Sequence, residues 1–224
     1  MKETSKSVMR RLHDNRFISR YFVGDGIDIG CGSDPISLYG ELFPFMRSLK
    51  PWDLVNGDAQ LLTDVADGSF DFVHSSHCLE HMRDPVEALG NWFRVLKPGG
   101  HLIILVPDED LYEMGVFPSR NNADHKWTFT LWKDNSWCDK SVNVVDLVKT
   151  LGAAAQPIKL ELLDGSYRYR LPRMDQTLTP IGECAIEIIV RKRPEAELAS
   201  KGVLPSAGQL NRDQFFALTG ISVK

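Results

Sequence analysis

The chain has 224 residues, 43% of them hydrophobic and 25% charged, as expected for one globular domain with a full core. Lys and Arg total 26 against 30 Asp and Glu, and this net charge of −4 argues against a nucleic-acid partner, because phosphate binding needs clustered positive charge. The longest aliphatic run, residues 102–106, is too short to span a bilayer, and the basic N-terminus lacks the apolar stretch of an export signal.

The cysteines at positions 31, 78, 138 and 184 form no Cys-x-x-Cys pair. The sequence therefore supports neither a zinc ribbon nor a small disulfide framework. Reduced thiols and the absence of an export signal both favour a cytoplasmic protein.

Residues 5–20 predict an N-terminal helix in which apolar positions alternate with five cations: Lys6, Arg10, Arg11, Arg16 and Arg20. We expect this helix to pack on the domain with its cations in solvent, in preference to a functional basic patch.

Residues 26–35, GIDIGCGSDP, predict a short buried strand followed by a sharp turn, and residues 36–47 predict a poor helix. The alternating segment 69–76 predicts a second strand. Asp84 and Pro85 predict a helix start, with Glu87 completing a capping box, and Lys97-Pro98-Gly99-Gly100 ends that helix before a buried strand at 101–107. This strand–helix–strand order predicts a doubly wound, mostly parallel sheet.

Residues 107–140 form a long irregular stretch that is rich in aromatic and polar side chains, which favours a functional loop. A helix at 141–152 and two strands at 158–163 and 184–190 follow, the strands as an antiparallel pair at a sheet edge. We expect one domain over residues 1–193 and a C-terminal tail over 194–224, with a short docking helix at 211–220.

The turn Asp28-Ile29-Gly30-Cys31-Gly32 is the first candidate binding motif. A dinucleotide site would place a third glycine where Pro35 stands, so pyrophosphate binding is disfavoured. The carboxylate of Asp28 has two interpretations: it attracts a cationic ligand, or it caps the turn.

Three further motifs follow in order: Gly57-Asp58-Ala59-Gln60, the strand that runs into Ser76-His77-Cys78-Leu79-Glu80-His81, and Leu-Lys-Pro-Gly-Gly-His-Leu at 96–102. Together with the glycine turn they resemble the class I S-adenosylmethionine-dependent methyltransferases, in particular the type 11 methyltransferase group. The resemblance covers residues 26–107, and it implies a seven-stranded Rossmann-like sheet and S-adenosylmethionine as the cofactor.

The resemblance also implies roles for individual residues. The methionine end of the cofactor would lie against Asp28, Gly30, Cys31 and Gly32, and the sulfonium region against Ser76 and His77. Adenine would lie against Asp58 and Ala59, and the ribose hydroxyls would bind Asp53 after a very short or irregular second strand.

Two histidine hypotheses concern chemistry. His74, His77 and His81, with Cys78 and Glu80 nearby, could be metal ligands, but a strand would hold the first ring away from the others, so we expect no metal site. We predict that the loop forms an acceptor pocket, with its His125 and with His77 at the end of the strand as catalytic residues. Tyr112, Lys126 and Trp127 of the loop are the predicted substrate-binding residues, and a plain surface loop is the alternative.

The sequence therefore predicts methyl transfer to a small-molecule or saccharide acceptor, at oxygen. Two alternatives stay open: an NAD(P)-dependent oxidoreductase on a related fold, and a non-catalytic module that binds S-adenosylmethionine. The oligomeric state is left undetermined.

Overall fold

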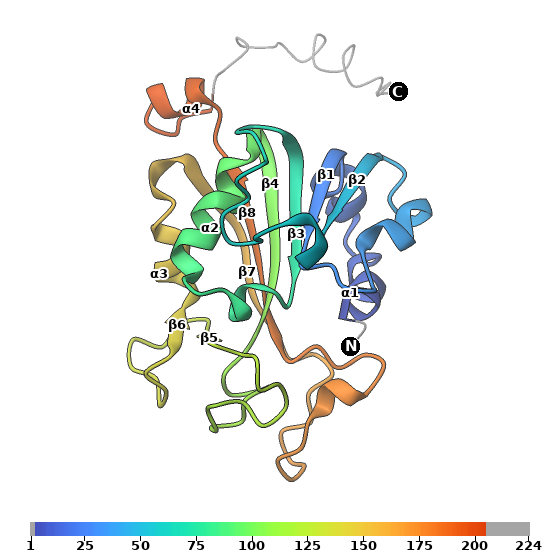
Figure 1. Cartoon of the computed structure of the whole chain (residues 1–224), viewed down its shortest axis with the longest axis vertical. Helices are drawn as coiled ribbons and strands as arrows, with labels where there is room; N and C mark the ends of the chain where they lie inside the picture. Colours follow the sequence, from blue (N-terminus) through green and yellow to red (C-terminus); the bar gives the residue numbers. More distant parts are fainter. Residues whose placement is uncertain (1–2, 205–224) are drawn as a thin grey trace, which may run out of the picture.

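A computed structural model describes residues 3–204, which form a six-stranded sheet with the strand order β2-β1-β3-β4-β8-β7 (Figure 1). The parallel strands are β1 (Gly24–Ile29), β2 (Met46–Trp52), β3 (Phe70–Ser76) and β4 (Leu96–Pro107). β8 (Ala185–Lys192) runs antiparallel to both β4 and the edge strand β7 (Ala155–Leu163). The prediction of a doubly wound, mostly parallel sheet with an antiparallel edge pair is confirmed.

The sheet has six strands in the described residues, not the seven that the resemblance implied. Residues 53–69, between β2 and β3, contain only the 3₁₀ helix Leu54–Asn56 and turns. Because another parallel strand would need a crossover of about a dozen residues on each side, this segment is too short to supply one. Two short strands, β5 (Thr128–Thr130) and β6 (Ser141–Asn143), pair separately.

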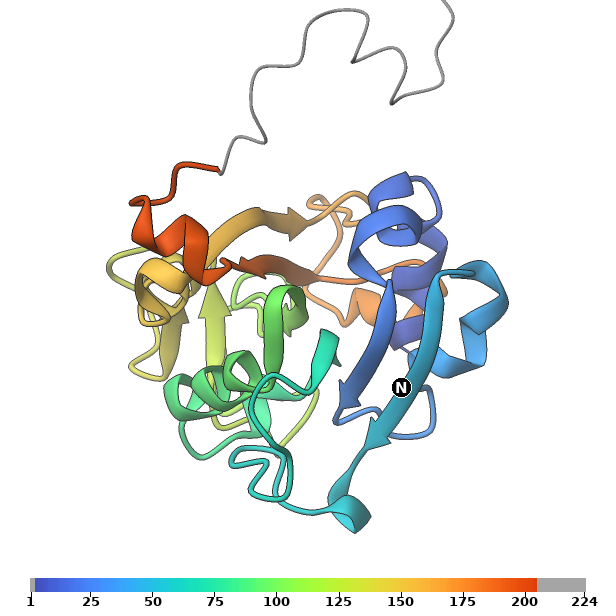
Figure 2. The same ribbon diagram turned by 90° about the horizontal axis from the view of Figure 1, so that it is seen from above.

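Alternating side chains of the central strands fill two cores, one on each face of the sheet. Val73 and Ile104 pack in the cluster beneath α2 (Pro85–Arg94) and α3 (Val144–Lys149), whereas Phe72 and Ile103 pack beneath the N-terminal helices. Figure 2 shows the N-terminal helices and α2 on opposite sides of the sheet. None of the helices in residues 3–204 has the length and apolar character needed to cross a bilayer.

The N-terminal helix differs from the prediction. α1 (Glu3–Arg11) ends early, and a π-helix, Phe17–Tyr21, follows a break. Asp14 lies in the break and accepts hydrogen bonds from the backbone and guanidinium of Arg16, which competes with helix continuation. The expectation that the cations lie in solvent is wrong for α1, because Lys6 and Arg11 are buried.

The start of α2 is capped by Asp84, which accepts from the amides of Val86 and Glu87. Glu87 does not complete a capping box. Instead, the Gln60 carboxamide accepts from the Asp84 amide at 3.1 Å and donates to the Glu87 carboxylate, so Gln60 joins α2 to the segment after β2.

Residues 108–127 and 164–184 gather with the start of α1 at the carboxyl end of the sheet (Figure 1). At this end β1 lies between β2 and β3, so the strand order reverses and a crevice forms, as is usual for ligand sites in such sheets. The short helix α4 (Glu195–Ala199) follows β8, and the docking helix expected at 211–220 lies outside the described residues.

Candidate active site

The turn after β1 depends on glycine. Gly30 and Gly32 have φ values of +69° and +52°, in the left-handed region. A side chain at Gly30 would also place its Cβ 2.3 Å from the Cys78 Sγ. The amide of Gly32 donates to the Asp53 carboxylate at 2.7 Å, which ties the turn to the end of β2. The turn is thus a backbone cradle open to a ligand.

Asp28 lies below this cradle and not in the crevice. One carboxylate oxygen accepts from the Ile36 amide at 2.8 Å, and the other lies 2.7 Å from the Nδ1 of His74. His74 in turn accepts at Nε2 from the buried Arg11 guanidinium, since arginine can only donate. Of the two interpretations of Asp28, its position favours the one in which it caps the turn, and not direct contact with a cationic ligand.

Two adjoining cavities lie along the crevice and share Gly30, His77, His81 and His125 as lining residues. The larger one, of about 900 Å³, is within the range typical of small-molecule sites. Among its lining residues are four of the residues predicted to bind cofactor or substrate: Asp53, Asp58, Ala59 and Lys126. The smaller cavity, of about 210 Å³, is lined by Cys31, Gly32, Ser76 and Tyr112, and by Glu3 and Thr4 of α1.

Asp53 lies directly after β2, which has seven residues and a register shift against β1 near its start, so the second strand is irregular, as expected, but not very short. Asp53 caps the 3₁₀ helix Leu54–Asn56 and lines the larger cavity, and each of its carboxylate oxygens accepts one backbone hydrogen bond and can accept another. Asp58 accepts from the amides of Gln60 and Leu61 and pairs with Arg83 at 2.8 Å, which lowers the pKa of Asp58. Both carboxylates can accept hydrogen bonds from a nucleoside.

His77 follows β3 with a φ of +54°, a backbone conformation that a non-glycine residue rarely adopts and that often marks functional sites. Its Nε2 and the Oγ of Ser76 are buried without a hydrogen-bond partner in residues 3–204. Burial alone would lower the pKa of His77, but the neighbouring Glu80 carboxylate raises it above its ordinary value.

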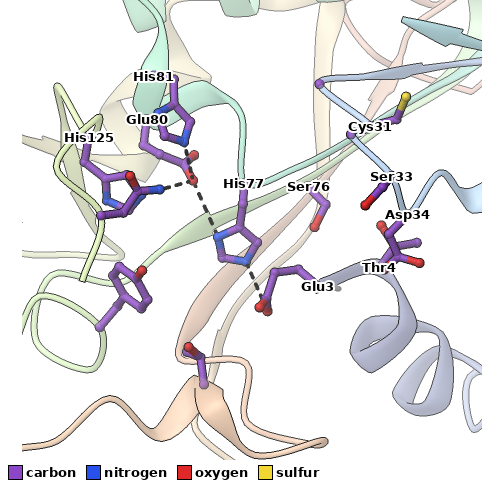
Figure 3. A pocket seen from close by; sticks show the side chains of 15 residues that line it. Glu3, Thr4, Cys31, Ser33, Asp34, Ser76, His77, Glu80, His81 and His125 are labelled. Atoms are coloured by element: carbon purple, nitrogen blue, oxygen red, sulfur yellow. Dashed lines mark ion pairs between the residues drawn. The ribbon is translucent and has the colours of Figure 1, made fainter. Parts of the chain in front are cut away.

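Glu80 lies at the centre of a histidine cluster (Figure 3). Its Oε1 is 3.5 Å from His77, 3.9 Å from His81 and 3.8 Å from His125. Burial would raise the pKa of Glu80, but the three imidazoles lower it. His74, which the sequence grouped with His77 and His81, lies in the separate buried network with Arg11, as expected for a ring on a strand.

The loop residues fall into two groups. Tyr112 and His125 line the smaller cavity with ring centroids 5.4 Å apart, and Lys126 lines the larger one. Trp127 lines neither cavity, so its position does not support its predicted role as a substrate-binding residue. Its N–H donates to the Met82 carbonyl, and the ammonium of Lys140 covers its ring.

Several lining residues were missed by the sequence reasoning. Glu3 and Thr4 reach the smaller cavity because α1 docks on the glycine turn, where Asp34 accepts from the Ser5 amide. Glu113 was missed as the partner of His125, which lies 2.7 Å away. Glu80 is the one of these site residues that the sequence could have indicated, because it lies inside the Leu-Glu-His motif.

These features fit S-adenosylmethionine. The glycine cradle permits close approach of a ligand to the backbone, and two carboxylates beside the larger cavity suit the hydroxyl and amino donors of a nucleoside. The buried Ser76 and His77 side chains keep unused polar atoms at the junction of the two cavities.

Residues 36–104 match the protein family described as "Methyltransferase domain". The UbiE ubiquinone/menaquinone biosynthesis C-methyltransferase of Roseobacter denitrificans is 38% identical over 81 residues, and that of Ruegeria sp. is 38% identical over 76 residues. The matched segments cover 32% and 30% of this chain, respectively, and the same shares of the relatives, so the chain spans about a third of their length.

A methyltransferase structure from Archaeoglobus fulgidus, described as S-adenosylmethionine-dependent, is similar in fold. It has 18% identity and a TM-score of 0.54, and the match covers 86% of this chain and 95% of that one. The matches favour this family over an NAD(P)-dependent oxidoreductase. The chain has the fold of an S-adenosylmethionine-dependent methyltransferase, and its residues 36–104 match the methyltransferase domain family.

Proposed function

We propose that this protein transfers a methyl group from S-adenosylmethionine to a small-molecule acceptor. The observation that carries the proposal is the crevice itself, in which the glycine cradle, Asp53, Asp58 and His77 border two adjoining cavities. The cofactor would supply an electrophilic methyl group on a sulfonium, so the protein's main contribution is alignment, worth about 7–11 kcal/mol in well-oriented systems.

The larger cavity would hold the nucleoside. Asp53 would accept from the ribose hydroxyls and Asp58 from the adenine amino group, with the Ala59 backbone beside the ring. The smaller cavity would hold the acceptor between Tyr112, Asn122 and the histidines. A volume of about 210 Å³ favours a small molecule or one sugar unit over a polymer segment.

His77 is proposed as the group that takes a proton from the acceptor, because its Nε2 has no hydrogen-bond partner in the described residues. His125, the other catalytic candidate, directs its Nε2 towards Glu80 and holds its Nδ1 against Glu113. We therefore place His77 ahead of His125 in this role.

We propose oxygen as the acceptor atom, because the smaller cavity is lined by hydrogen-bonding groups that suit a hydroxylated acceptor. Carbon is the second candidate, since the matched relatives are named C-methyltransferases. The proposed compartment remains the cytoplasm, where the four free cysteines would stay reduced.

Calorimetric titration with S-adenosylhomocysteine tests the cofactor site. The wild-type protein should bind one equivalent, and Asp53→Ala should bind about 10–100-fold more weakly, since a hydrogen bond to a charged group contributes about 1.5–3 kcal/mol. Asp134→Asn, at an exposed loop position, is the matched control and should bind like the wild type. Equal affinity of the Asp53→Ala protein would remove Asp53 from the site.

Turnover is tested by incubating the protein with ¹³C-methyl-labelled S-adenosylmethionine and a panel of hydroxylated acceptors. The NMR shift of the transferred methyl distinguishes an oxygen from a carbon product. Tight binding of S-adenosylhomocysteine without a methylated product from any acceptor would favour the alternative of a non-catalytic binding module.

A further inference from the structure

Three donor side chains of the smaller cavity converge without forming hydrogen bonds to one another. Glu80 and His81 come from the 3₁₀ helix Leu79–His81, and His125 comes from the loop after β4. One ligand atom from each lies within 4.8 Å of the other two. Figure 3 shows the two imidazoles directed at the Glu80 carboxylate.

Glu80 is fully buried, and neither of its carboxylate oxygens has a hydrogen-bond partner within residues 3–204. A buried carboxylate without hydrogen bonds is unfavourable unless a cation or a metal ion compensates it. The Nδ1 of His77 lies 3.5 Å from the Glu80 Oε1, and the unsatisfied oxygens indicate that a further positively charged partner belongs beside Glu80.

The distances point to a metal ion as this partner. The Nε2 atoms of His81 and His125 are 3.9 and 3.8 Å from the Glu80 Oε1, which is too long for a hydrogen bond. Two ligands bound at about 2.0–2.1 Å to a tetrahedral ion lie about 3.3 Å apart. The two histidine nitrogens lie about 0.5–0.6 Å farther from Glu80 than one shared ion would place them, and all three ligand atoms lie within 4.8 Å of one another, so a small approach of the side chains would close them around an ion.

The other nitrogen of each histidine is held by the protein. The Nδ1 of His81 donates to the Asp124 carbonyl at 3.1 Å, and the Nδ1 of His125 lies 2.7 Å from the buried Glu113 carboxylate. Because both partners are acceptors, the protons reside on Nδ1, and the Nε2 lone pairs face Glu80. Metal-binding histidines are commonly oriented in this way.

The backbone brings the loop to Glu80. The amides of Lys126 and Trp127 both donate to the Glu80 carbonyl, at 2.9 and 3.2 Å, and this places His125 opposite the 3₁₀ helix. Side chains of the same two residues add to these main-chain contacts, since the Lys126 ammonium donates to the His81 carbonyl and the Trp127 N–H donates to the Met82 carbonyl.

We propose that Glu80, His81 and His125 bind one divalent transition-metal ion, with zinc as the best match. A set of two histidines and one glutamate is a known catalytic zinc set, in which the fourth position stays open to water or substrate. Here that position would face the smaller cavity. The metal site does not depend on the proposed function. A role for the metal ion in holding an oxygen of the acceptor does depend on the proposed function.

The test uses the untagged full chain, stripped of metal with a chelator and titrated with zinc chloride by calorimetry. We expect the wild type to bind one equivalent of zinc and to unfold at a higher temperature when zinc is present. When Co²⁺ replaces zinc, we expect visible ligand-field bands. His81→Ala, His125→Ala and Glu80→Gln should lose these signals, and Glu113→Gln should bind zinc about 10–100-fold more weakly.

His13→Ala, at an exposed histidine outside the cavities, is the matched control and should keep full zinc binding. Circular dichroism without metal establishes that each variant is folded, and Glu80→Gln keeps the shape of the side chain. Titration of the metal-free protein with S-adenosylhomocysteine tests the cofactor site separately. Zinc binding that is absent in the wild type, or unchanged in the three ligand variants, would overturn the proposal.

Discussion

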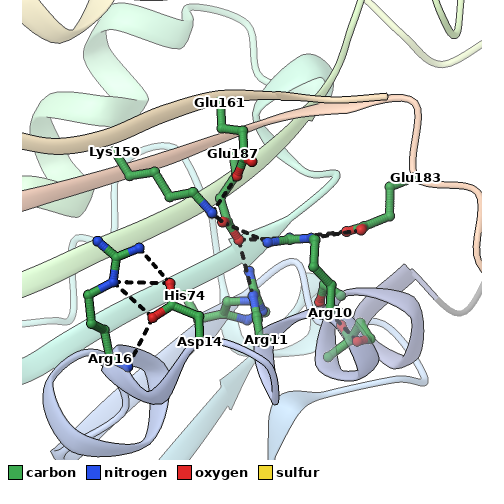
Figure 4. A network of polar contacts seen from close by, with 11 residues as sticks. Arg10, Arg11, Asp14, Arg16, His74, Lys159, Glu161, Glu183 and Glu187 are labelled. Atoms are coloured by element: carbon green, nitrogen blue, oxygen red, sulfur yellow. Dashed lines mark hydrogen bonds and ion pairs between the residues drawn. The ribbon is translucent and has the colours of Figure 1, made fainter. Parts of the chain in front are cut away.

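Replacing Glu187 with glutamine is expected to lower the free energy of unfolding by about 3–5 kcal/mol, because it leaves a buried cation without its counterion. The Glu187 carboxylate is fully buried on β8 and contacts Arg10, Arg11 and Lys159 at 2.8–3.2 Å (Figure 4). Arg11 is also fully buried, and its only other described side-chain hydrogen bond is to the neutral ring of His74. Chemical denaturation of both proteins measures the difference.

Glu161→Gln is the matched control, because Glu161 also pairs with Lys159 but lies exposed on β7. It should change the stability by less than about 1 kcal/mol. Adding Arg11→Met to Glu187→Gln should restore part of the loss, since the uncompensated charge is then gone. A Glu187→Gln protein as stable as the control would contradict the role assigned to the network.

The same network predicts the pH dependence of the difference. Burial would raise the pKa of Glu187, but Arg11 and Arg10 lower it from 4.5 to about 2. A carboxyl group with a lowered folded-state pKa stabilises fully above its unfolded value, and this stabilisation is lost as the pH falls through about 2. The stability difference between wild type and Glu187→Gln should be constant above pH 4.5 and shrink below it, as denaturation at several pH values would show.

Gly30→Ala is expected to disrupt the cofactor cradle and to weaken S-adenosylhomocysteine binding by at least about tenfold, or 1.4 kcal/mol. The left-handed φ costs a non-glycine residue about 1–2 kcal/mol, and the contact of the new Cβ with Cys78 adds overpacking of about 1–3 kcal/mol. Calorimetry and denaturation measure the two losses in the same protein.

The Gly90→Ala variant is expected to be more stable than the wild type and to keep its ligand affinity in the same assays. Gly90 is exposed on α2, and an added Cβ would meet no atom within 4 Å. The variant should gain about 0.4–1 kcal/mol of stability and bind S-adenosylhomocysteine normally. Similar ligand affinities for the two alanine variants would show that Gly30 is not part of the cradle.

Local patterns were sufficient to predict most of the sheet and one side of the site. Alternation predicted β3, the apolar run predicted the core of β4, and Asp84 with Pro85 predicted the start of α2. The resemblance to the methyltransferases implied that the glycine turn, Asp53 and His77 lie at one site, and the structure brings Gly30, Asp53 and His77 together at the larger cavity.

Pairings between distant residues could not be predicted from local patterns. Arg11 and Glu187 are 176 positions apart, and nothing near α1 indicates that its cations have a buried acid to meet. Likewise, the loop after β4 contains several aromatic and polar side chains that are equally plausible site residues. The contact of its backbone with the Glu80 carbonyl places His125 at the cavities, while the Trp127 side chain donates a hydrogen bond to the Met82 carbonyl. Side-chain direction in an irregular loop depends on such tertiary contacts.

The central claim is that the carboxyl edge of β1, β2 and β3 binds S-adenosylmethionine, and a crystal structure of the protein with S-adenosylhomocysteine tests it most directly. We expect the sulfur beside the Gly30–Gly32 turn and His77, the ribose at Asp53 and the adenine between Ala59 and Asp58. Crystals grown at saturating ligand that show this crevice empty, or the nucleoside bound elsewhere, would contradict the account.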